Sequence, residues 1–133
     1  VKYKVLFGAA ADTKLQAKFK VVKNTGKTIN DNNLKVRIVN AMNDFFDINN
    51  WDFGDRFYLS ELSTYVLNVV SPDISNLVIL PRQSSQAFGS LFEIQSKPDE
   101  IFANGATVDD IEIVTSITAA EINAATNSIV SNT

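Results

Sequence analysis

Cysteine and histidine are both missing from this chain of 133 residues. Without cysteine it has no disulfide framework, no thiolate nucleophile and no zinc–thiolate site. Without histidine it lacks the usual general base, the commonest transition-metal ligand and every triad built on Ser-His or Cys-His. We therefore expect a non-catalytic protein with no catalytic residues, no metal site and no cofactor.

Long apolar runs are missing as well. A membrane-spanning helix needs roughly 18 apolar residues, whereas the glycine-free run from Leu77 to Leu80 is only long enough for a strand. Hydrophobic residues make up 45% of the chain and charged residues 20%, which is typical of a globular domain. We expect no membrane insertion and one domain with a hydrophobic core.

The sequence begins at Val1, without an initiator methionine or a signal-peptide pattern. This beginning indicates a processed chain or a fragment. We expect residues 1–133 to form a single α+β domain at the C-terminal end of a longer structural protein.

Basic residues are scarce in the second half of the chain. Residues 1–56 hold ten Lys or Arg and six Asp or Glu, a net charge of +4, whereas residues 57–133 hold two and nine, a net charge of −7. Such a separation can favour antiparallel or head-to-tail contacts between copies. A solvated charged surface is the commoner meaning.

Hydrophobic spacing predicts the elements of the first half. Residues 2–7 and 15–22 read as strands, the second with apolar and polar residues in alternation. Side-chain oxygens at 31–33 suit a helix start, and a second helix is predicted from Ser60. The apolar faces predicted for these helices are Leu34, Ile38, Ala41, Met42 and Phe45, and Leu62, Val66 and Val69.

The second half is predicted to return to strands. Residues 77–80 form an apolar strand, which we place at the sheet centre, and residues 88–95 and 107–115 form two more, connected by 98–105. A capping-box pattern at 118–121 precedes a short terminal helix. The predicted fold is therefore α+β: a small mixed or antiparallel sheet with two consecutive helices packed on one face, plus a short C-terminal helix.

Three patterns resemble ligand-binding motifs but fail the spacing test. Gly26-Lys27-Thr28 lacks the first glycine of a phosphate-binding loop, because Val21 stands there. The stretch from Gly8 to Lys14 has Thr13 in place of the second glycine. The aspartates from 44 to 55 do not follow the order of a calcium loop, and solvation of a helix end explains them better.

Two other functions stay open from the residues alone. A basic strand could track nucleic acid, although Phe19 falls on its buried face. Paired carboxylates could serve a hydrolase, although such pairs are ordinary on a protein surface. The basic residues are Lys14, Lys18, Lys20, Lys23 and Lys27, and the carboxylates are Asp99, Glu100, Asp109, Asp110 and Glu112.

Two segments resemble a known family. Residues 51–62 (WDFGDRFYLSEL) are similar to the C-terminal region of baseplate J-like proteins of contractile phage tails and related injection machines, within a wider resemblance over about residues 14–80. Residues 102–113 (FANGATVDDIEI) are similar to the ending of baseplate wedge proteins of T-even-type contractile phages.

This resemblance implies a structural protein of the virion, located in the tail baseplate and assembled in the host cytoplasm. It implies a wedge subunit that self-associates and contacts other baseplate wedge proteins to form an inner ring around the tail tube. The resemblance implies no active site. We also expect no small-molecule substrate and, with a sequence pI of about 4.8, no nucleic acid.

We expect the contact between copies to be two-fold, as in a homodimer, because this is the commonest symmetry of protein oligomers. A short terminal helix often buries its apolar stripe against another chain. The residues predicted at this protein interface are Ile122, Ile129 and Val130.

Overall fold

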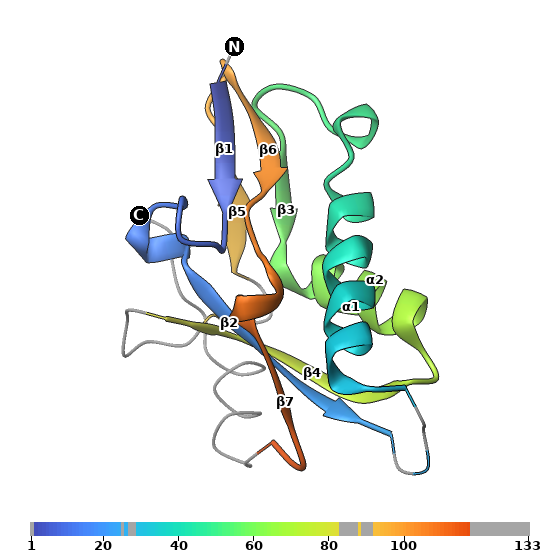
Figure 1. Cartoon of the computed structure of the whole chain (residues 1–133). Coiled ribbons are helices and arrows are strands. Elements are labelled where there is room, and N and C mark those ends of the chain that lie inside the picture. The colour runs from blue at the N-terminus through green and yellow to red at the C-terminus, as the bar shows by residue number, and fades with distance from the viewer. Residues whose placement is uncertain (1, 25, 27–28, 83–87, 89–91, 118–133) are drawn as a thin grey trace.

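The computed structural model describes residues 2–24, 26, 29–82, 88 and 92–117 (Figure 1). It has two α-helices, α1 (Asp31–Phe45) and α2 (Leu59–Val70), among short strands, so the predicted α+β class is confirmed. The strands are β1 (Lys2–Leu6), β2 (Ala17–Lys23), β3 (Arg56–Tyr58), β4 (Ile74–Pro81), β5 (Glu93–Gln95), β6 (Glu100–Asn104) and β7 (Ile111–Val114). Three 3₁₀ turns lie between them, η1 (Thr13–Leu15), η2 (Ile48–Asn50) and η3 (Val108–Asp110).

The strands form three small sheets instead of the single sheet predicted. The largest has the order β4-β2-β7, with β2 antiparallel to β4 and parallel to β7. Strand β1 pairs with β6 in parallel, and β3 pairs with β5 in antiparallel. The prediction that the strand around 77–80 lies at the sheet centre is wrong, because β2 takes that place. Pro81 has no N–H to donate and suits an edge strand.

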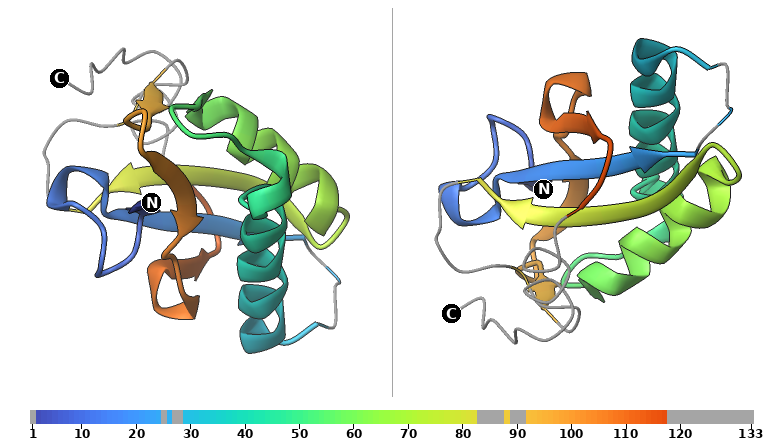
Figure 2. Two further views of the ribbon diagram at one scale, coloured as in Figure 1. Left: turned by 90° about the horizontal axis from the view of Figure 1, so that it is seen from above. Right: turned by 90° about the horizontal axis from the view of Figure 1, so that it is seen from below.

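Both helices bury the stripe that hydrophobic spacing predicts, except at Phe45 and Val69. In α1, Asn30 caps the first turn by accepting a hydrogen bond from the Asn33 N–H, so the cap lies one residue before the predicted start at 31–33. The buried side chains are Leu34, Ile38, Ala41 and Met42, whereas Phe45 is half-buried. In α2, Val69 is 41% exposed and Val70 is buried, because the row begun by Leu62 and Val66 continues at a spacing of four residues. Figure 2 shows that both helices lie against the same half of the β2–β4 pair.

An aromatic cluster joins the sheets to the helices. Its members come from both halves of the chain and meet mostly edge to face, an arrangement that adds to the stabilisation from burial. Trp51 also donates a hydrogen bond from Nε1 to the Phe45 carbonyl, at 2.7 Å. The cluster consists of Phe7, Phe19, Phe45, Phe46, Trp51, Phe57, Tyr65 and Phe102.

The sequence did not predict strands β3 and β6, and two predicted strands are shorter than expected. Strand β6 lies inside the stretch 98–105 predicted as a connection, because Ile101 and Phe102 are both buried and no alternation marks it. Strand β3 has only three residues. Residues 107–115 contain η3 before β7, and β5 covers only the end of 88–95. The predicted terminal helix lies outside the described residues.

Candidate assembly surfaces

The uneven charge of the two halves is largely offset within the chain. Among the described residues, ion pairs join the basic first half to the acidic second half. These pairs are exposed to solvent to different degrees, and exposed pairs contribute little to stability. They are Lys2–Asp99 (3.7 Å), Lys18–Glu112 (3.7 Å), Arg37–Asp73 and Arg56–Glu93 (3.8 Å).

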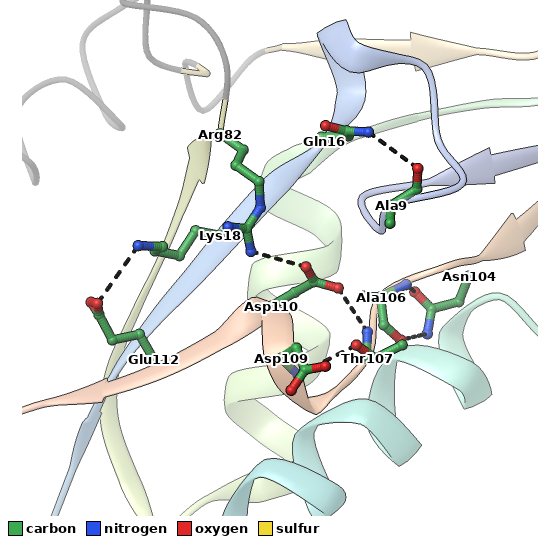
Figure 3. Close-up of polar contacts among 10 residues, drawn as sticks. All are labelled: Ala9, Gln16, Lys18, Arg82, Asn104, Ala106, Thr107, Asp109, Asp110 and Glu112. Atoms are coloured by element: carbon green, nitrogen blue, oxygen red, sulfur yellow. Dashed lines mark hydrogen bonds and ion pairs between the residues drawn. The ribbon is translucent and has the colours of Figure 1, made fainter.

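Asp110 is one of the carboxylates considered for acid–base chemistry, but its hydrogen bonds hold the local fold together. It is only 7% exposed and lies at the end of η3, where its Oδ2 accepts a hydrogen bond from the Thr107 N–H at 2.9 Å. Its Oδ1 accepts one from Arg82 Nη2 at 3.0 Å (Figure 3). The pair fixes the end of β4 to the start of β7.

Three other carboxylates of this group, Asp99, Glu100 and Glu112, have separate partners. Glu100 accepts a hydrogen bond from the Lys97 N–H at 2.8 Å, and Asp99 and Glu112 take part in the ion pairs above. Within the part of the chain that the structure describes, no three Asp or Glu side chains gather in a group that could hold a metal ion. The arrangement therefore gives the hydrolase alternative no support, since that chemistry needs convergent carboxylates.

The aspartates between 44 and 55 serve the backbone. Asp47 caps η2, with Oδ1 accepting from the Asn49 N–H at 2.8 Å. Asp55 Oδ2 accepts from the Asp52 N–H at 3.0 Å and closes the turn before β3. These are the local side-chain-to-backbone bonds typical of such residues at turns.

The lysines of β2 lie beside acidic residues. Lys18 forms an ion pair with Glu112 of β7, and Lys20 stands in register with the same glutamate. Lys23 pairs with Asp31 at 3.3 Å. Phe19 is fully buried, as predicted, so it is not available to stack on a base. The arrangement favours a solvated strand face over a nucleic-acid site.

Several large apolar side chains are exposed, and the segments that carry the most exposed ones lie at one end of the molecule. The most exposed are Tyr3 (59%), Ile48 (55%) and Phe53 (50%). Strand β1 and the loop between η2 and β3 lie at the same end (Figure 1), where the Gly54 N–H donates to the Glu100 carbonyl at 3.2 Å. Spacing rules did not single these residues out, because each lies outside an amphipathic helix. Ile122, Ile129 and Val130, the predicted interface, lie outside the described residues.

No model of a known protein family matches this chain, and no curated protein matches its sequence at a significant level. None of the helices in the described part of the chain is long and apolar enough to cross a membrane.

Proposed function

We propose that this chain is a structural assembly domain of a contractile phage tail baseplate wedge protein. In this role it associates with further copies of its parent and contacts other wedge proteins, forming an inner ring around the tail tube. Its location would be the baseplate of the virion. Such a subunit needs a rigid fold and complementary surfaces but no catalytic group.

One contact carries this proposal. The segments that resemble the wedge family, residues 51–62 and 102–113, are far apart in the sequence but adjacent in the fold. The ring centroids of Trp51 and Phe102 lie 5.2 Å apart, and those of Phe57 and Phe102 lie 5.1 Å apart. A chance likeness in two separate segments would not require them to share one core, whereas a common ancestral domain would.

The exposed apolar residues add a second, weaker support. Tyr3, Ile48 and Phe53 are large side chains that a monomer gains nothing by exposing, and aromatic residues are enriched at protein interfaces. Phe53 belongs to the segment that carries the resemblance.

Electron microscopy of tailed particles from cells that produce this chain tests the proposal. Gold-labelled antibody raised against residues 1–133 is expected to mark the baseplate at the end of the tail. Labelling of the capsid, or labelled protein that never co-purifies with particles, would overturn it. Antibody adsorbed with the chain provides the control.

A further inference from the structure

Strand β1 has an open edge. The Lys2 N–H donates to the Asp99 carbonyl at 3.0 Å, and the Leu6 carbonyl accepts from the Gly105 N–H at 2.9 Å. Alternate residues of a strand bond to the same parallel neighbour, so the N–H and C=O groups of Tyr3 and Val5 point away from β6. Among the described residues no second strand pairs with β1.

Strands β7 and β4 are the outer strands of the three-stranded sheet, again among the described residues. Strand β4 has no charged residue, so it offers no charge to a strand paired with it. In β7, Glu112 is flanked by Ile111 and Ile113, and all residues after Ile111 are partly exposed. Strands β1 and β7 are therefore outer strands of opposite charge, with Lys2 and Lys4 on β1 and Glu112 on β7.

Charge decides which of these edges can pair. Two β1 strands aligned in antiparallel about Tyr3 would place Lys2 opposite Lys4 of the partner copy, and like charges opposite each other are destabilising. Lys2 pairs with Asp99, but Lys4 makes no ion pair within the described residues. A β7 strand laid beside β1 would instead bring a glutamate to Lys4.

The acidic edge has a matching arrangement. Glu112 already stands in register with Lys20 of β2 on one side. A β1 strand added on the other side of β7 would bring Lys4 beside Glu112. Lys20, Glu112 and Lys4 would then form a row across three neighbouring strands. Opposite charges in such cross-strand pairs are stabilising.

We propose that β1 of one copy adds to β7 of a second copy, which joins two of the small sheets into one sheet across the contact. This inference rests on the proposed function, of which it names the contact surface and the partner. Strands β1 and β7 lie at opposite ends of the molecule (Figure 1), so each copy can offer one edge at each end. Such a head-to-tail contact generates a closed ring or an open filament, whereas the two-fold contact expected from symmetry alone ends at a dimer.

Cysteine cross-linking tests this contact, because the native chain has no cysteine that could interfere. Lys4→Cys and Glu112→Cys are made in separate chains, mixed and oxidised. A disulfide between the two different variants is expected, with little between identical ones. Cross-links only between identical variants, or none although the native chain is oligomeric, would overturn the inference.

Charge reversal gives a second readout. Lys4→Glu is expected to weaken association by about tenfold, since one favourable pair becomes a repulsive one, and Lys4→Gln, which only removes the attraction, should weaken it less. Lys35→Glu, on α1 and away from both edges, is the matched control and should leave association unchanged. An equal loss in the Lys35→Glu control, or a loss with Lys4→Gln as large as that with Lys4→Glu, would contradict the pairing.

Light scattering on the native chain separates this inference from the proposed function. A native monomer at every concentration would remove self-association and this contact together. An oligomer that survives Lys4→Glu would remove the β1–β7 contact and leave self-association standing. Circular dichroism of each variant confirms that its fold is retained.

Discussion

Gly8 and Gly105 pack so closely that no side chain fits between them. A Cβ atom on Gly8 would lie 1.8 Å from the Gly105 carbonyl oxygen. Both backbone N–H groups donate to the same Leu6 carbonyl, at 3.0 and 2.9 Å. The chain leaves β1 and β6 at this point, so the contact sets how the β1–β6 pair joins the sheet formed by β2, β4 and β7.

Gly8→Ala is expected to lower the free energy of unfolding by about 3 kcal/mol, because the added methyl group displaces the backbone of Gly105. Gly26→Ala is the matched control. Gly26 has a φ of +81° but nothing within 4 Å of a Cβ, so its cost should be about 1 kcal/mol. Urea unfolding followed by the fluorescence of the single tryptophan, Trp51, measures both. Equal losses would show that the close contact is not the cause.

Phe102→Ala is expected to cost about 3–5 kcal/mol, since a buried ring at the centre of the aromatic cluster leaves a cavity. Phe53→Ala, in an exposed position, should change the free energy of unfolding by less than about 0.5 kcal/mol. Thermal unfolding by circular dichroism compares the two. A small effect at Phe102 would contradict the shared core that supports the proposed function.

Arg82→Ala is expected to cost about 1–2 kcal/mol. It leaves the Asp110 carboxylate buried with one partner fewer, although Arg82 itself is partly exposed and the loss is reduced by solvent. Lys2→Ala breaks the exposed Lys2–Asp99 pair and should cost less than about 0.5 kcal/mol. Urea unfolding at neutral pH measures both losses of unfolding free energy. Similar losses for the two variants would mean that the burial of Asp110 does not make its ion pair more stabilising.

Single-stranded oligonucleotides are expected not to bind this chain, even at low salt. The lysines of β2 lie beside Glu112 and Asp31, and Phe19 is buried. Fluorescence anisotropy with a labelled oligonucleotide, at about 10 mM and about 150 mM salt, measures this. Binding that falls steeply with salt and is lost in a Lys18→Ala, Lys20→Ala double variant would revive the nucleic-acid alternative.

The helices could be predicted from the sequence because their signals are local. The polar residues at 31–33 marked the helix start to within one residue of the actual cap, Asn30, and the stripe from Leu34 to Met42 repeats with the period of a helix. Val69 was misassigned because spacings of three and four residues are both compatible with a helix, and only the packing of α2 against β4 selects Val70.

The arrangement of the strands could not be predicted, because it depends on partners far away in the sequence. Strands β1 and β2 pair in parallel with β6 and β7 from the other end of the chain. Periodicity gives no sign of this pairing, nor of the contact between Gly8 and Gly105. The opposite charges of the two halves did indicate a contact between them, but this contact consists of ion pairs within one molecule.

The mass of the chain in solution tests the account most directly. Size-exclusion chromatography with light scattering, over a hundredfold range of concentration of about 1 to 100 μM, should give masses that rise from the 14.6 kDa of one chain to those of closed or open multimers. Lys4→Glu should shift this rise to higher concentration. A mass of 14.6 kDa throughout would contradict the claim that this domain joins copies of its parent protein.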